Sequence, residues 1–167
     1  MYEALKQIID NIVDKSRSVR ILFNAEEWTS TIPSRPGWYW IKTNTPIQVL
    51  ENVGAPSSRA HVNIPVTIGS TLRLAGMAIM PPGDRSYVIY NGEATNLKAR
   101  AREHVEGHSA TYCLGLLEYD SLQEYDWTFS YITLAELGLA DSTSKQLRII
   151  VEQAWRAEYG WPILCKK

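Results

Sequence analysis

Hydrophobic positions at the start of the chain repeat with helical spacing. Leu5, Ile8, Ile12 and Val13 belong to one apolar stripe within residues 2–16, and acidic and lysine side chains occupy the opposite face. This pattern predicts an amphipathic helix that packs either on the rest of the domain or on a second subunit. We expect no chemistry from it.

Aromatic and β-branched side chains concentrate in a few later segments. Residues 38–42, 86–91 and 127–133 have the composition of strands, and residues 111–117 resemble them, although a helix is an alternative there. The segment 31–37 contains two prolines and predicts a turn-rich lead-in to the first strand.

Two further helices are indicated by their capping residues. Thr95 or Asn96 can cap a helix that follows the second strand. Polar residues 141–144 precede another apolar stripe with helical spacing, which Gly160 brings to an end. Because strands and helices interleave along the chain, the pattern predicts the α+β or the α/β class.

Residues 43–85 form the least regular part of the sequence. Prolines and glycines interrupt short apolar runs such as 47–50 and 62–68, which predicts one or two short strands or hairpins within a long excursion. Long excursions of this kind often carry binding functions, so we expect this one to contact substrate.

The composition is that of a globular domain. The chain has 167 residues, of which 45% are hydrophobic and 21% charged, enough for one well-buried core. No apolar stretch is long enough to cross a bilayer, and the first residues show no secretory leader, so we expect no membrane and a cytoplasmic location. Cys113 and Cys165 lack metal-site spacing and are expected to be buried thiols.

A net charge of −1 constrains any interaction with nucleic acid. Affinity for DNA rests on neutralising phosphates, so a basic stripe must exist locally and be offset by acid elsewhere. Positive residues do cluster, at Lys98, Arg100 and Arg102 on one predicted helix and at Arg156 and residues 166–167 near the C-terminus.

The most informative motif is Y-x-G-x3-N-L-x2-R-x3-H, which runs from Tyr90 to His104 in fifteen residues. It predicts a strand that ends in a tyrosine, a tight turn at Gly92, and a helix on which Arg100 and His104 lie on one face. An arginine offers a planar fork of donors to a phosphate, and a histidine moves a proton near neutral pH. A tyrosine becomes a base only beside a cation or a base.

Together with Pro-Gly-Trp-Tyr ending at Tyr39, this motif resembles the GIY-YIG nuclease superfamily. In that family, two core strands carry paired tyrosines, and the next helix carries an arginine followed one turn later by a histidine or tyrosine. The resemblance implies that Tyr39 and Tyr90 are the paired tyrosines. It also implies that Arg100, eight residues after Gly92, is the catalytic arginine and that His104 follows it.

The resemblance also implies a metal site and a set of substrate contacts. In the family a glutamate on a later helix holds a single divalent ion, which points to Glu152, ten residues before Pro162, as the ligand of Mg²⁺ or Mn²⁺. Tyr39 is expected to activate the attacking water, with help from His104 or Tyr90. The expected substrate-binding residues are Gly92, Asn96, Lys98, Arg102 and Arg156.

The family's architecture refines the expected fold. Residues 1–35 would form an N-terminal helix and lead-in, and residues 36–167 a GIY-YIG-like domain with 43–85 as an insertion, so that the chain is effectively one domain. The expected class is α+β, with a small antiparallel central sheet flanked by helices and a β-rich excursion. The resemblance is carried by residues 36–42 and 87–104 and, more loosely, by 148–165.

The resulting hypothesis is a metal-dependent endonuclease, of restriction type, that hydrolyses phosphodiester bonds in double-stranded DNA. One site per chain would cut both strands as a homodimer, for which the N-terminal helix is a candidate interface. The sequence leaves open whether the substrate is DNA or RNA. The alternative hypothesis is a catalytically inactive module of the same fold that binds nucleic acid or regulates a partner. The near-neutral charge favours that alternative, as does Glu93, which places negative charge near the phosphate.

Several features of the sequence allow a different assignment. An unrelated α+β protein can match such a motif by chance. Glu158 and the acidic run 118–126 compete with Glu152 as metal ligands, although the run has the composition of a solvated loop. His104 and His108 are four residues apart, as zinc ligands on a helix often are, but the sequence offers no obvious third ligand.

Overall fold

A computed structural model describes residues 2–74, 76–83 and 85–165 of the chain. Its helices are α1 (Tyr2–Lys15), α2 (Ile47–Glu51), α3 (Ile64–Thr71), α4 (Leu97–Glu106) and α5 (Lys145–Tyr159). Its strands are β1 (Arg17–Arg20), β2 (Gly37–Thr43), β3 (Tyr87–Ala94) and β4 (Trp127–Thr133). Single turns of 3₁₀ helix lie at η1 (Glu26–Thr29), η2 (Leu116–Glu118), η3 (Asp120–Leu122) and η4 (Ala135–Leu137).

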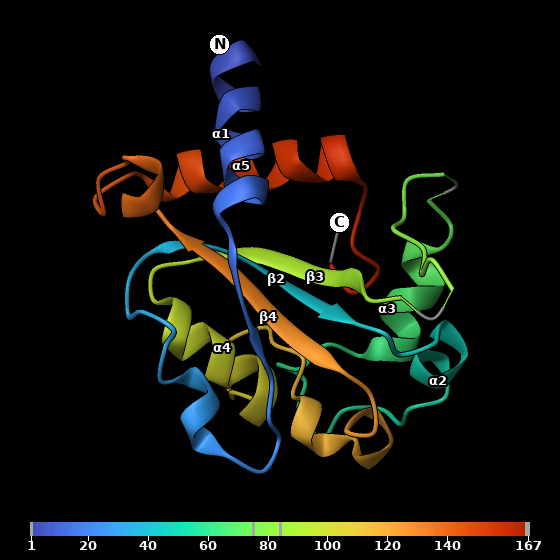
Figure 1. Cartoon of the computed structure of the whole chain (residues 1–167). Coiled ribbons are helices and arrows are strands. Elements are labelled where there is room, and N and C mark those ends of the chain that lie inside the picture. The colour runs from blue at the N-terminus through green and yellow to red at the C-terminus, as the bar shows by residue number, and fades with distance from the viewer. Residues whose placement is uncertain (1, 75, 84, 166–167) are drawn as a thin grey trace.

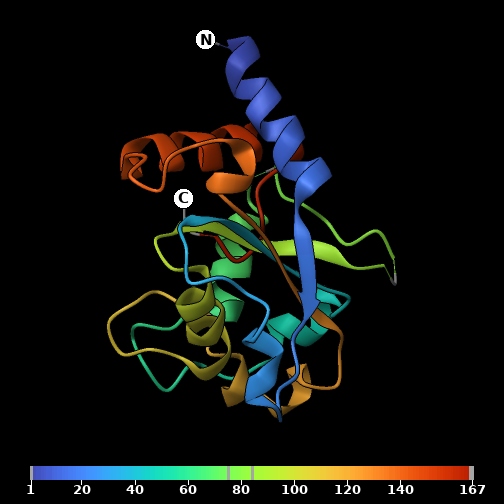
Figure 2. The ribbon, with the colours of Figure 1, turned by 60° about the vertical axis from the view of Figure 1, so that its left-hand side comes forward.

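The four strands of the described residues form one antiparallel sheet in the order β1-β4-β2-β3. Figure 1 shows α1 and α5 on one side of this sheet and α2, α3 and α4 on the other. Figure 2 shows the N-terminal part of α1 extending beyond the rest of the molecule. The fold is therefore α+β with a small central antiparallel sheet flanked by helices, as the sequence predicts at this level. No helix of the described residues is both long and apolar enough to span a bilayer.

Strand β2 lies inside the sheet and contributes side chains to two hydrophobic cores, one on each face of the sheet. Successive side chains of a strand point to opposite faces, so Trp38 and Trp40 pack with α1 and α5. Tyr39 and Ile41 belong to the larger core on the other face, together with α2, α3 and α4. Neighbouring residues of β2 therefore lie in two different hydrophobic cores.

A β-bulge in β3 decides which of its side chains reach Tyr39. The register between β2 and β3 shifts at Ile41 and Lys42, so that Ile89 is the extra residue between Val88 and Tyr90. A bulge places two neighbouring residues against one residue of the partner strand. Ile89 and Tyr90 both enter the larger core, while Val88 packs with the smaller core.

The predicted turn at Gly92 is wrong, because β3 continues through it to Ala94. Gly92 lies opposite Tyr39 in the sheet, and a Cβ atom at this position would come within 2.5 Å of the Tyr39 hydroxyl oxygen. The glycine is therefore required by the aromatic ring that crosses it. Gly37 also has no room for a side chain, because a Cβ there would overlap the carbonyl oxygen of Ile132.

The predicted β-rich excursion at residues 43–85 is also wrong, because the two apolar runs form α2 and α3. The side chain of Asn63 caps α3 by accepting from the backbone N–H of Val66, with Pro65 in the first turn. Proline is tolerated there because the first N–H groups of a helix have no partner inside it. Buried Ile64 and Ile68 then hold α3 against the larger core.

Two other segments differ from expectation. Residues 111–117 form no strand: Cys113 makes an isolated bridge with His61, and a 3₁₀ turn begins at Leu116. Strand β1, for which the sequence predicts no strand, pairs with β4 and becomes an edge of the sheet, which its exposed sequence Arg-Ser-Val-Arg does not indicate. The helices at α1, α4 and α5 and the strands at β2, β3 and β4 are confirmed.

Gly92→Ala should destabilise the fold by about 1–3 kcal/mol, because the added methyl group has to displace the Tyr39 ring in a packed core. Gly69→Ala is the matched control, since a Cβ there meets nothing within 4 Å and the residue lies in α3. It should be neutral or stabilising by up to about 1 kcal/mol. Urea unfolding of both variants measures the difference, and equal effects would disprove the proposed contact.

Candidate functional site

The hydroxyl group of Tyr39 is the centre of a buried polar cluster. Arg100 donates from Nε to this oxygen at 2.9 Å, and Nε2 of His104 lies 2.9 Å from it. Both partners come from one face of α4, so the spacing of Arg100 and His104 does bring them to one point. Tyr39 is 1% exposed and His104 is fully buried.

The hydrogen bonds of His104 determine its tautomer. Its Nδ1 accepts from the backbone N–H of Leu114 at 3.3 Å, so Nδ1 carries no proton. The neutral ring therefore carries its proton on Nε2 and donates it to Tyr39. Burial, and then the charge of Arg100, lower the pKa of His104 well below its usual range, which keeps the ring neutral. Neither nitrogen is a free acceptor in this arrangement, which favours a positioning role for His104 over the expected proton transfer.

The Tyr39 oxygen therefore receives two donors and keeps its own proton. Burial raises the pKa of Tyr39 above its usual value, while the charge of Arg100 and its hydrogen bond act in the opposite direction. At neutral pH the phenol is protonated. Two donors aimed at one oxygen are nevertheless the arrangement that stabilises negative charge there.

An open groove of about 440 Å³ lies beside this cluster. Tyr90 and Arg100 line it, and Tyr39 lies below them without reaching its surface. The rings of Tyr39 and Tyr90 are stacked with centroids 6.3 Å apart. Burial also raises the pKa of Tyr90 well above its ordinary value. Of the two motif tyrosines, Tyr90 is the one that a molecule in the groove can contact.

Arg100 lines the groove, and three of its N–H donors already have partners. Besides Tyr39, its guanidinium contacts the carboxylate of Glu103 at 2.8 Å and the backbone carbonyl of Tyr112 at 2.5 Å. An arginine has five N–H donors, so these three contacts leave two for a bound anion. Glu103 partly neutralises the charge that a phosphate would meet.

Glu152 lies at the outer edge of β3 near the same end of the sheet. Its Oε2 accepts from the backbone N–H of Glu93 at 3.0 Å, and its Oε1 contacts Arg156 at 2.6 Å. Burial raises the pKa of Glu152, while Arg156 lowers it. The charge of Glu152 also raises the pKa values of Tyr39 and Tyr90, so the carboxylate is electrostatically coupled to both tyrosines.

The donor set around Glu152 suits a divalent ion only in part. A carboxylate oxygen is a ligand that Mg²⁺ prefers, and each oxygen of Glu152 holds a single donor in the contacts above. No group of three or more histidine, cysteine, aspartate or glutamate side chains that could hold a metal occurs within the described residues. An ion at Glu152 would therefore take most of its ligands from water and substrate and would compete with Arg156.

Only one of the five expected substrate-binding residues lines the groove. Asn96 lines the groove, but its side chain already caps α4 by accepting from the N–H of Ala99. Lys98 and Arg102 are not among the residues that line the groove, and Nε of Arg102 contacts the Thr29 hydroxyl at 3.3 Å. Gly92 is buried beneath the Tyr39 ring.

Arg156 is buried as well, at 9% exposure. It donates to the Asn91 side chain at 2.8 Å and stacks over the ring of Trp161. A phosphate in solution does not reach its guanidinium in this arrangement. Residues 166–167, the other cations expected near the C-terminus, lie outside the described part of the chain.

Sequence reasoning missed one arginine that changes the electrostatics. Arg148 lies one turn before Glu152 on α5 and donates to the carboxylate of Glu93 at 2.8 Å. Glu93 is therefore paired rather than a bare negative charge beside the groove. The four-residue spacing of Arg148, Glu152 and Arg156 is visible in the sequence and indicates one helix face. Lys145, at the start of the same helix, lines the groove and is exposed.

The remaining predictions about polar residues have mixed outcomes. Cys113 and Cys165 are free, buried thiols, as predicted, and burial raises the pKa of Cys165 to about 11. The acidic side chains of the run 118–126 are exposed to solvent, as expected, although Glu118 contacts His61 and Asp126 contacts Arg20.

Comparisons of this chain with models of protein families, with curated proteins and with solved structures found no match. The geometry of the site is therefore the basis for the function proposed below.

His104 should make stability fall as the pH is lowered. Its pKa is depressed in the folded state, so the unfolded chain, with an ordinary pKa of about 6.5, binds more protons in acid. Stability is fully present above that pH and declines below it, approaching about 1.4 kcal/mol per pH unit. Urea unfolding from about pH 8 to about pH 5.5 measures this slope across the ordinary histidine pKa.

The matched variants are His104→Gln and His108→Gln. Glutamine keeps an N–H donor for Tyr39 but does not titrate, so His104→Gln should flatten the slope. His108 is exposed, and its replacement should leave the slope unchanged. The reverse result would assign the titration to His108 and remove the argument for a neutral, buried His104.

Proposed function

We propose that this chain is a metal-dependent endonuclease that hydrolyses DNA phosphodiester bonds with a site of the GIY-YIG type. The observation that carries the proposal is the Tyr39 hydroxyl held between Arg100 and His104 at the base of a groove lined by Tyr90. These are four of the five catalytic residues that the family resemblance implies, the fifth being Glu152. They come from two adjacent strands and from the helix that follows, as the resemblance implies.

The proposed chemistry begins with phosphate binding by Arg100. A scissile phosphate in the groove would accept from the two remaining guanidinium donors, which then face the negative charge that grows on phosphorus oxygens as water attacks. The exposed ammonium of Lys145, on the same groove, would hold the adjacent backbone. The carboxylate of Glu103 would repel this phosphate and would have to move away from Arg100 as the phosphate arrives.

The two tyrosines have different parts in this proposal. Tyr90 lines the groove and would contact the attacking water or the departing oxygen. Tyr39 is buried and would orient Arg100 through its hydroxyl, with His104 fixing the hydroxyl in turn. The direct activation of water by Tyr39 that the sequence suggests is less consistent with its 1% exposure. A divalent ion held by Glu152 would supply positive charge to the phosphate oxygens.

A second candidate function is a catalytically silent, nucleic-acid-binding module of the same fold. The ion pairs of Arg100 with Glu103 and of Glu152 with Arg156 favour it, because each ties up a group that catalysis needs. Incubating the purified chain with supercoiled plasmid and Mg²⁺, with a chelator as control, separates the two functions. Metal-dependent nicking supports the nuclease. DNA binding without nicking supports the module, and the absence of DNA binding would contradict both functions.

Arg100→Ala should reduce the rate of plasmid nicking by about 100- to 1000-fold, the usual effect of removing one donor that stabilises a transition state. Arg102→Ala is the matched control, because Arg102 lies two residues away on α4 outside the groove lining. It should leave the rate nearly unchanged. Equal losses in both variants would indicate a diffuse phosphate contact and would end the assignment of Arg100 as the catalytic arginine.

Glu152→Gln should abolish metal-dependent nicking and weaken Mn²⁺ binding measured by calorimetry in the presence of DNA. The amide keeps the shape of the side chain and an acceptor for the Glu93 N–H, so folding should survive. Glu158→Gln is the control on the same helix, since Glu158 is exposed. If Glu152→Gln cuts normally and Glu158→Gln does not, the metal ligand is Glu158.

A further inference from the structure

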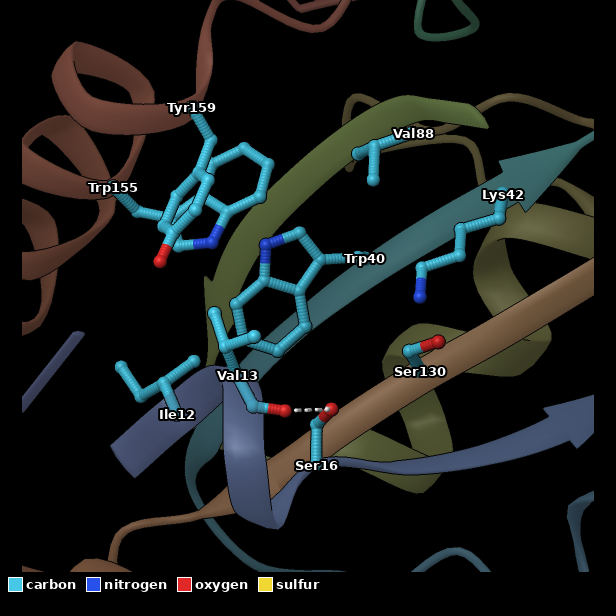
Figure 3. A pocket seen from close by; sticks show the side chains of 9 residues that line it. All are labelled: Ile12, Val13, Ser16, Trp40, Lys42, Val88, Ser130, Trp155 and Tyr159. Carbon is cyan, nitrogen blue, oxygen red and sulfur yellow. Dashed lines mark hydrogen bonds between the residues drawn. The ribbon is translucent and has the colours of Figure 1, made fainter. Parts of the chain in front are cut away.

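A second pocket lies on the opposite face of the sheet, between α1, α5 and the strands β2, β3 and β4. It is open to solvent on one side and has a volume of about 160 Å³. Figure 3 shows the side chains around it, which are Ile12, Val13, Ser16, Trp40, Lys42, Val88, Ser130, Trp155 and Tyr159. Nothing in the proposed nuclease chemistry uses this pocket, because Trp40 and Lys42 point away from the face that holds Tyr39.

Three aromatic rings form one wall of the pocket. The ring centroids of Trp40 and Trp155 are 5.8 Å apart, and those of Trp155 and Tyr159 are 5.2 Å apart. An apolar cavity of about 150 Å³ is large enough to hold benzene. The volume and the wall therefore suit a single small planar ring.

Two donors at this pocket, the Lys42 ammonium and the Trp40 indole N–H, have no carboxylate partner among the described residues. Lys42 is half-buried, and burial lowers the pKa of its ammonium with no carboxylate acting on it. The indole Nε1 of Trp40 is buried and has no hydrogen-bond partner among the described residues. Figure 3 shows this nitrogen turned toward the rings of Trp155 and Tyr159, and the Lys42 side chain directed toward Ser130. No aspartate or glutamate lines the pocket within the described residues.

The charge of Lys42 decides which ligand the aromatic wall can accept. Clusters of aromatic rings attract cations through the negative faces of their π-systems. An ammonium group already in the pocket repels a second cation and lacks a counter-ion, so an anion is favoured.

We propose that this pocket binds a small planar carboxylate, with its ring among Trp40, Trp155 and Tyr159 and its carboxylate paired with the Lys42 ammonium. The ligand would replace the missing acceptor at Lys42 and fill the apolar space beside it. This binding is independent of the proposed nuclease function, and its test requires neither DNA nor metal.

Benzoate is the probe, and benzamide is its neutral counterpart of the same shape. NMR titration of the Trp40 and Trp155 indole N–H signals should give a benzoate dissociation constant on the order of 1 mM, typical of a fragment of this size. Benzamide should bind at least about tenfold more weakly, because it cannot form the charge pair with the Lys42 ammonium.

Two variants test whether the Lys42 ammonium binds the carboxylate. A third removes a lysine elsewhere and shows whether the loss of any positive charge has the same effect. Lys42→Met keeps the apolar stem and should weaken benzoate binding about tenfold or more. Val13→Glu introduces a carboxylate at an exposed position of the pocket and should have a similar effect. Lys6→Met removes a cation of α1 that does not line the pocket and should leave binding unchanged.

Three results would overturn the proposal. Equal affinity for benzoate and benzamide would show that the charge of Lys42 is not used. Tighter binding of benzyltrimethylammonium than of benzoate would make this an aromatic cation site. The absence of any shift of the two indole signals at saturating benzoate would show that the pocket takes no such ligand. Circular dichroism of each variant confirms that the fold is retained.

Discussion

The rest of the site depends on the packing of the Tyr39 ring across Gly92. This contact buries a phenolic hydroxyl in the larger core, where an unpaired polar group would cost about 1–3 kcal/mol. The hydroxyl therefore needs donors, and α4 supplies Arg100 and His104 from one of its faces. The backbone N–H of Leu114 then fixes the His104 tautomer. A single packed ring thus requires glycine at position 92 and explains why Arg100 and His104 share one face of α4.

The two faces of the sheet carry different sites, the groove on one face and the second pocket on the other. Tyr39 faces the groove side, whereas Trp40 faces α1 and α5. The bulge at Ile89 preserves this separation on the neighbouring strand, because it turns Tyr90 toward Tyr39 while Val88 stays with the second pocket. The proposed catalytic groove and the proposed small-molecule pocket therefore share no lining side chain. Strand β3 and helix α5 each contribute lining residues to both.

Arginine–glutamate pairs reconcile the near-neutral charge with the proposed substrate. Arg100, Arg148 and Arg156 each hold a carboxylate, respectively Glu103, Glu93 and Glu152. Breaking such a largely buried pair leaves a charge without compensation, so phosphate or metal has to replace the lost partner as it arrives. The proposed nuclease therefore binds its substrate by exchanging ion-pair partners, and the exposed cation ready to meet DNA at the groove within the described residues is Lys145.

The sequence by itself determined the features that rest on local periodicity and capping. The helix at α1, the strand at β4, the Asn96 cap and the shared face of Arg100 and His104 all follow from neighbours a few residues apart. Tertiary structure decided the rest. Apolar runs as short as those of α2 and α3 have the same pattern in helices and strands, and exposed β1 exists because β4 pairs with it. Gly92 is a strand residue because a distant ring crosses it, and the partner of Arg148 lies 55 positions away. Such contacts depend on how the chain packs, which spacing along the sequence does not encode.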